Sequence, residues 1–298
     1  MTLPASHADR LARARVALEG LSVGDAFGDR FFGPREEVIP RIRARVVPDP
    51  PWRWTDDTHM ALSIVEMLTE RRSIDRATLV RRFAERMDPH RKYGVGAFNL
   101  LTAVREGQPW DVAATSLFDG MGSFGNGAAM RIAPLGAYFA DDLPRAIDES
   151  RRASDVTHAH PEGVAGGIAV AVAAAHACRV RALDTGLLDV VLESTPHGFT
   201  HDAIDEARRV PATASIVDAA IALGNGSGVT APDTVPLCLW VLAHHAITYE
   251  DALWTTVHAL GDRDTTCAIV GAVAACALGV DSIPGAWRAS REPIADFP

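Results

Sequence analysis

The sequence predicts an all-α protein: a compact, single-domain helical bundle that spans residues 1–298. Apolar residues recur with the three-to-four-residue period of a helix face, and the alternating pattern of half-buried strands is absent. No internal repeat or low-complexity linker divides the chain. With 48% hydrophobic and 22% charged residues, 298 residues suffice for one large core.

The N-terminal segment predicts a helix followed by a long loop. Ser6 and Asp9 resemble a capping box, and an apolar helical face continues from Leu11 to Leu21. The next segment, at about 25–51, contains two glycines and five prolines. This composition predicts a loop, and loops of that length are commonly functional.

The remaining chain is expected to be helical, with a central helix that is rich in alanine and glycine. Small residues allow helices to pack closely, which favours Pro161–Cys178 for that central place. Gly279 is a plausible C-cap for the last helix. The predicted helices are Thr55–Glu70, Ile74–Met87, Val95–Glu106, Trp110–Phe118, Leu143–Ala153, Pro161–Cys178, and one from about Asp264 to Gly279.

Charge and cysteine usage exclude some functions. A net charge of −9 does not attract nucleic acid or anionic lipid, so no general nucleic-acid affinity is expected. The most apolar runs look too short to span a bilayer, and no signal core follows the N-terminal residues. Four cysteines in apolar helical runs, without a C-x-x-C pair, indicate reduced core residues of a cytoplasmic protein.

Two acidic clusters stand at helix starts about 200 residues apart: Trp54–Thr58 (WTDDT) and Gly261–Thr266 (GDRDTT). Helix capping alone explains either cluster, because Thr and Asp are common in a first turn. Their duplication favours a metal site, since paired carboxylates repel one another unless a cation lies between them. All-oxygen ligands select Mg²⁺, Mn²⁺ or Ca²⁺ over Zn²⁺.

A glycine-rich segment, Gly122–Arg131, and a histidine pair are further candidates for ligand binding. Glycine turns bring backbone N–H groups close to phosphate oxygens, although an ordinary turn is the alternative. Phe124 in that turn suits stacking on a base or ribose. His158 is expected to hydrogen-bond or stack, whereas a structural role fits His160 as well.

The order of these motifs resembles the ADP-ribosylglycohydrolase (ADP-ribosylhydrolase) family over about residues 11–285. The ordered set is more specific than any single piece, and the resemblance implies a compact all-α fold with a dinuclear Mg²⁺ or Mn²⁺ centre. The motifs are Gly24–Gly28, Trp54–Thr58, Gly122–Arg131, Thr157-His158, Leu223–Gly226 and Gly261–Thr265.

The resemblance also assigns roles to residues. It places Asp25 as a carboxylate behind or beside the metals. It makes the metal ligands Thr55, Asp56, Asp57, Asp262, Asp264 and Thr265. It places around the diphosphate and the adjoining ribose Gly122, Ser123, Phe124, Gly125, Asn126 and His158.

One departure from the family pattern affects the cavity mouth. Many members carry a glutamate about seven residues after the aspartate of the motif that is Gly24–Gly28 here. This chain has Phe32 at that position, preceded by Phe31. At least one of these two aromatics should be buried, because an exposed pair would form a sizeable apolar patch. Phe32 is a candidate gate that would narrow the entrance and change the choice of substrate. The alternative is that both aromatics only anchor the loop to the core.

The expected activity is hydrolysis of an ADP-ribosyl bond at the anomeric carbon of the distal ribose. Two Mg²⁺ ions (or Mn²⁺) would position a water, and Asp56 or Asp57 would accept its proton. The expected partner is ADP-ribose or an ADP-ribosylated substrate whose acceptor stays open. The alternatives are an ADP-ribose-binding module with little turnover, another two-metal nucleotide hydrolase, and a structural protein on a hydrolase scaffold.

Overall fold

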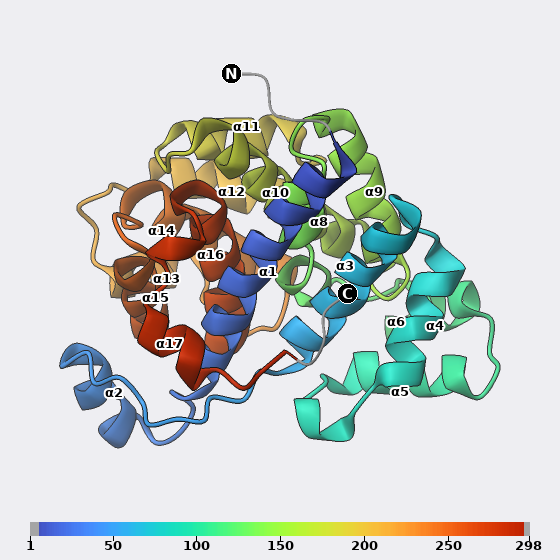
Figure 1. Ribbon diagram of the computed structural model, residues 1–298, viewed down its shortest axis with the longest axis horizontal. Coiled ribbons are helices and arrows are strands. Elements are labelled where there is room, and N and C mark those ends of the chain that lie inside the picture. Colours follow the sequence, from blue (N-terminus) through green and yellow to red (C-terminus); the bar gives the residue numbers. More distant parts are fainter. Residues whose placement is uncertain (1–5, 295–298) are drawn as a thin grey trace.

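The fold is helical throughout the part of the chain that the computed structural model describes, residues 6–294 (Figure 1). That part is 71% helical and contains no strand, which confirms the predicted all-α class. The α-helices are α1 (His7–Asp29), α2 (Arg35–Arg43), α3 (Asp56–Arg71), α4 (Arg76–Arg86), α5 (Val95–Arg105), α6 (Trp110–Gly120), α7 (Gly127–Met130), α8 (Ala133–Tyr138), α9 (Leu143–Asp155), α10 (Pro161–Val180), α11 (Gly186–Ser194), α12 (Phe199–Arg209), α13 (Ile216–Leu223), α14 (Ala231–His244), α15 (Tyr249–His258), α16 (Arg263–Leu278) and α17 (Gly285–Ser290). Two short 3-10 helices, η1 (Pro89–Arg91) and η2 (Val280–Ser282), complete the list.

α1, from the first part of the chain, packs against α16, from its last part, near the middle of the molecule (Figure 1). Glycines on α1 allow direct contact between the two backbones. A Cβ atom at Gly24 would lie 2.1 Å from the carbonyl oxygen of Cys267, and one at Gly28 would lie 2.1 Å from that of Arg263. This contact carries Asp25 to the start of α16.

The prediction of a loop over about residues 25–51 is wrong in its extent. α1 continues to Asp29, and α2 occupies much of the remainder. Gly28 is not a helix breaker here, because it is the contact residue that α1 needs against α16. Between α1 and α3, irregular backbone is confined to residues 30–34 and 44–55.

α10 is the central helix that the Ala/Gly-rich segment predicts, but it is longer than expected. Its 20 residues are long and apolar enough to cross a membrane, which corrects the expectation that the run is too short. Within the fold, 83% of the most apolar 18-residue stretch of α10 is buried. It packs against α8, α9, α14 and α16, among others. This is the position of a core helix.

α4, α5 and α6 form a lobe at one side of the bundle (Figure 1). α6 does not end regularly: Leu117, Phe118 and Asp119 leave the helical conformation, and Phe118 has a φ of 52°. The other predicted helices agree with the structure within about two residues. The four cysteines are buried and free, as the sequence predicts.

Candidate metal and ligand site

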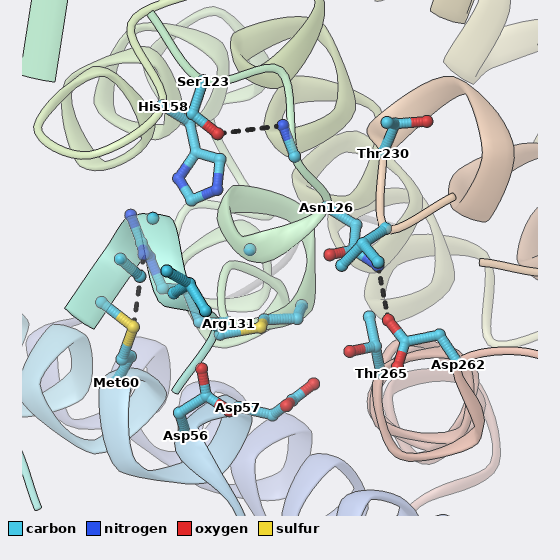
Figure 2. A pocket seen from close by; sticks show the side chains of 18 of the residues that line it. Asp56, Asp57, Met60, Ser123, Asn126, Arg131, His158, Thr230, Asp262 and Thr265 are labelled. Atoms are coloured by element: carbon cyan, nitrogen blue, oxygen red, sulfur yellow. Dashed lines mark hydrogen bonds between the residues drawn. The ribbon is translucent and has the colours of Figure 1, made fainter. Parts of the chain in front are cut away.

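The two acidic clusters meet in one cavity of about 500 Å³. Thr55 is the N-cap of α3, and Asp56 and Asp57 occupy its first turn. Asp262 is the N-cap of α16, and Asp264 lies in the first turn. All four aspartates line the cavity, and Figure 2 shows those of α3 facing the space bordered by α16. Tertiary structure therefore joins carboxylates that lie about 200 residues apart.

Asp25 lies behind this cavity and fixes the start of α3. Its carboxylate accepts hydrogen bonds from the backbone N–H of Thr55 at 2.9 Å and from the Thr55 hydroxyl at 2.9 Å. It also accepts from the N–H of Thr58 at 3.1 Å and from the Thr58 hydroxyl at 2.5 Å. Complete burial raises the pKa of Asp25 to about 6, against the effect of these hydrogen bonds. Asp25 thus organises the loop that presents Asp56 and Asp57.

The carboxylates of the cavity are buried and repel one another. Burial raises the pKa of Asp57 well above its usual value, and repulsion from Asp25, Asp264, Asp56 and Asp262 raises it further. The pKa values of Asp56 and Asp264 are raised for the same two reasons. Asp57 Oδ2 lies 2.9 Å from the Thr55 hydroxyl, whose single proton it shares with Asp25 Oδ1, and Asp57 Oδ1 is buried without a partner. Both features fit a bound cation.

The donor set fits Mg²⁺ or Mn²⁺ in kind, because its members are carboxylate and hydroxyl oxygens. Within residues 6–294, however, no three His, Cys, Asp or Glu side chains already enclose one point as a metal cage. The fold thus brings the carboxylates to one cavity without closing a metal cage around a single point.

The glycine-rich segment forms the opposite wall of the cavity (Figure 2). Asn126 connects it to the acidic cluster, since its Nδ2 donates to Asp262 Oδ2 at 2.7 Å and to the Thr234 hydroxyl at 3.0 Å. The hydroxyl of Ser123 accepts from the N–H of Gly125 at 3.2 Å. Asn126 therefore orients an acidic residue as well as facing the ligand space.

The ring of His158 lies against the same glycines. A Cβ atom at Gly125 would be 3.2 Å from His158 Nε2, and one at Gly127 would be 2.9 Å from it. Burial, followed by the charge of Arg131, lowers the pKa of His158 to about 3. His158 is therefore neutral in this site.

Most of the sequence-predicted residues reach the cavity, and a few do not. Those that line it are Asp56, Asp57, Ser123, Phe124, Gly125, Asn126, His158, Asp262, Asp264 and Thr265. Thr55 and Asp25 lie behind this wall, joined to it through Asp57 and Thr58. Gly122 also lies outside the lining, where its Cβ position would be 2.8 Å from the N atom of His160.

Phe31 and Phe32 have different environments. Phe31 is fully buried against Phe27, with ring centroids 5.0 Å apart, so the expected burial of one aromatic is confirmed. Phe32 is 45% exposed, and the Arg263 guanidinium lies 5.0 Å from its ring centroid. Phe32 does not line the cavity, and its role as a gate stays a prediction.

Sequence reasoning missed Phe118, Lys92 and Arg131, which also line the cavity. Phe118 is 52% exposed, and its ring centroid lies 6.3 Å from that of Phe124. Its position depends on the left-handed backbone at the end of α6, which no local pattern announces. The sequence did contain a signal for Arg131, because it ends the glycine-rich segment as a charged residue in an otherwise apolar run.

Comparisons with known proteins agree with this geometry. The family model described as ADP-ribosylglycohydrolase matches residues 6–296. The chain is 26% identical to ADP-ribosylhydrolase ARH3 of Gallus gallus, over 94% of this chain and 89% of that protein. It is 28% identical to ADP-ribosylarginine hydrolase Tri1 of Pseudomonas putida, over 93% of this chain and 73% of that protein.

The fold has a solved counterpart as well. A structure titled "ADP-ribosylglycohydrolase-related protein complex" superimposes with a TM-score of 0.66 and 24% identity, covering 95% of this chain and 93% of the other. This similarity shows a shared fold. Because the family model spans nearly the whole chain, the protein belongs to the ADP-ribosylglycohydrolase family and is a hydrolase of that family.

Proposed function

We propose that the protein hydrolyses an ADP-ribosyl bond at the anomeric carbon of the distal ribose, in a reaction that depends on two divalent metal ions. The observation that carries the proposal is the meeting of four aspartates beside a glycine-rich wall in one cavity. Relatives named ADP-ribosylhydrolase support the same reaction class.

The ions would be Mg²⁺, or Mn²⁺, held by the side-chain oxygens of six residues. Bound there, they would lower the pKa of a water molecule and orient the hydroxyls of the ribose. The repulsion among the buried carboxylates and the unpartnered Asp57 Oδ1 support cation binding at this place. The six residues are Thr55, Asp56, Asp57, Asp262, Asp264 and Thr265.

The chain's own residues orient the substrate and accept a proton. Asp56 or Asp57 would take the proton of the attacking water at a carboxylate oxygen. The backbone of Ser123–Asn126 would hold the diphosphate, since Gly125 leaves room for close approach. Phe118 and Phe124, both in the cavity wall, offer aromatic faces to an adenine base. Binding at this remote end would orient the scissile bond.

The test is a hydrolysis screen with ADP-ribose linked to arginine, serine, a nucleobase, an acetyl ester or a small molecule. We expect free ADP-ribose as the product in Mg²⁺, and no product in excess chelator. Asp57→Ala and Asp264→Ala should each lower kcat by at least about 100-fold, because each removes a predicted ligand. Asp251→Ala is the matched control, since Asp251 also lies in the first turn of a helix but does not line the cavity.

Other products would select the alternatives. AMP release would indicate cleavage of the diphosphate, and hence another two-metal nucleotide hydrolase. Tight binding of ADP-ribose without turnover of any linkage would indicate a binding module. Full activity in chelator, or full activity of Asp57→Ala, would contradict the metal-dependent mechanism.

A further inference from the structure

Arg131 is a buried cation without a carboxylate partner in the described part of the chain. It is 0% exposed, and its Nη2 donates to the carbonyl oxygen of Ala153 at 2.9 Å and to the Thr157 hydroxyl at 2.7 Å. Nη1 reaches only the sulfur of Met60, at 3.5 Å, and Nε has no partner (Figure 2). The guanidinium also lies over the Phe83 ring, 4.7 Å from its centroid, but its hydrogen-bond partners are neutral acceptors. Burying a charge on such partners is costly, so this position calls for an explanation.

The hydroxyl of Thr157 connects Arg131 to His158. Thr157 Oγ1 lies 2.8 Å from His158 Nδ1. A guanidinium can only donate, so the hydroxyl accepts from Arg131 and keeps its own proton for another acceptor. His158 Nδ1 is the acceptor within reach of that proton. If Nδ1 instead carried a proton and donated it to the hydroxyl, the Thr157 hydroxyl proton would be left without this acceptor. Thr157 is only 1% exposed, so water could not easily replace it, and an unpaired buried donor is costly.

An accepting Nδ1 places the imidazole proton on Nε2. Nε2 lies against Gly125 and Gly127, about 3 Å from where their Cβ atoms would be, and all three residues line the cavity. The nearby charge of Arg131 and the burial of the ring disfavour a second proton, since they lower the pKa of His158 to about 3. The ring therefore presents one fixed N–H donor beside the glycine-rich wall.

We propose that Arg131 and Thr157 are positioning residues that hold His158 as a neutral imidazole protonated on Nε2, so that it donates to a phosphate oxygen of the ligand. The identity of that ligand rests on the proposed function, whereas the relay from Arg131 to His158 does not. His158 acts as a hydrogen-bond donor and not as a base. In this relay of hydrogen bonds, the Arg131 guanidinium sets the direction in which the Thr157 hydroxyl donates. That role explains why the charge of Arg131 is buried here.

The relay is tested on the ligand-free protein by the ¹⁵N shifts of its histidine side chains. We expect a protonated Nε2 and an unprotonated Nδ1 for His158. Thr157→Val should convert this to a mixture of tautomers, and Thr157→Ser should restore the wild-type pattern. Thr256→Val is the matched control, because it removes an equally buried hydroxyl that bonds only the carbonyl oxygen of Ala252.

Arg131→Met should have the same effect on the tautomer as Thr157→Val, since it leaves the hydroxyl without its donor. If Arg131→Met does not fold, Thr157→Val still decides the question. Protonation of His158 on Nδ1 in the wild type, or an unchanged Nε2 signal in Thr157→Val, would overturn the relay.

The second measurement is ADP-ribose affinity by calorimetry. Thr157→Val should raise Kd about 5- to 10-fold, because the donor is no longer fixed toward an anionic oxygen. His158→Ala should raise Kd by at least as much, and adding Thr157→Val to it should change nothing further. Independent effects of the two substitutions would refute the coupling. No binding to the wild type, together with the Nε2 tautomer, would support the relay and refute the proposed function.

Discussion

Asp57 is the residue where stability and the proposed function conflict most directly. One carboxylate oxygen is held by the Thr55 hydroxyl, and the other is buried without a partner among like charges. Folding raises its pKa, so the folded state holds protons that the unfolded chain would release. The resulting stability is present at low pH and is lost as pH rises through the folded-state pKa. Asp25, with a pKa of about 6, adds to this loss between pH 4 and about 7.

Asp57→Asn should therefore stabilise the protein in chelator and abolish its stabilisation by Mg²⁺. The amide oxygen keeps the bond from Thr55, and the repulsion disappears. At pH 8 without metal, Tm should rise by about 2–4 °C for each kcal/mol gained, and the gain should shrink toward pH 4. Differential scanning calorimetry from pH 4 to 8 measures this.

Asp251→Asn is the control for that series, because hydrogen bonds from Arg45 and Thr248 lower the pKa of Asp251. It should not stabilise the protein at pH 8. If Asp57→Asn shows no pH-dependent gain, the carboxylates do not repel one another as the fold implies.

At the scale of elements, the contact between α1 and α16 fixes the distance between Asp25 and the second acidic cluster. An alanine normally stabilises a helix interior by roughly 1 kcal/mol relative to glycine. At Gly24 the added Cβ would lie 2.1 Å from a backbone oxygen of α16, which no rotamer change relieves. Overpacking outweighs helix propensity here.

Gly24→Ala should reduce the free energy of unfolding by about 1–3 kcal/mol in urea denaturation. It should also weaken Mg²⁺ binding, because the start of α16 moves away from Asp25. Gly285→Ala is the control, since a Cβ atom there meets nothing within 4 Å. An unchanged or increased stability of Gly24→Ala would mean that the two helices are not in backbone contact.

At the scale of the whole molecule, the cavity lies where several parts of the chain meet. Its wall includes the starts of α3 and α16, the glycine-rich segment, Lys92, and the start of α5 from its N-cap Gly94 to Ala97. A ligand that binds there should order all of these together. A cation alone should order only the two acidic helix starts.

Hydrogen–deuterium exchange separates these two effects. Adding Mg²⁺ should protect residues 55–58 and 262–266 together, since ions between them would restrain both. Adding ADP-ribose should extend protection to 92–97 and 122–127. Protection of one acidic helix start without the other would contradict a shared centre.

The sequence by itself determined the helical class, the boundaries of seven of the seventeen α-helices in the described part of the chain, and the residues of the acidic clusters. Helical periodicity and capping are local, so they can be read without knowledge of the fold. The family resemblance predicts metal-ligand roles for these residues, and the structure brings the two clusters to one cavity.

Tertiary structure decided what local patterns do not encode. It made Gly28 a helix contact residue where a loop was expected, and Gly24 another just before that segment, because the partner backbone comes from a distant part of the chain. It turned Phe118 into the cavity through a left-handed backbone. It also placed Arg131 behind His158, a relation that depends on the packing of α7 with α9 and α10 rather than on either segment alone.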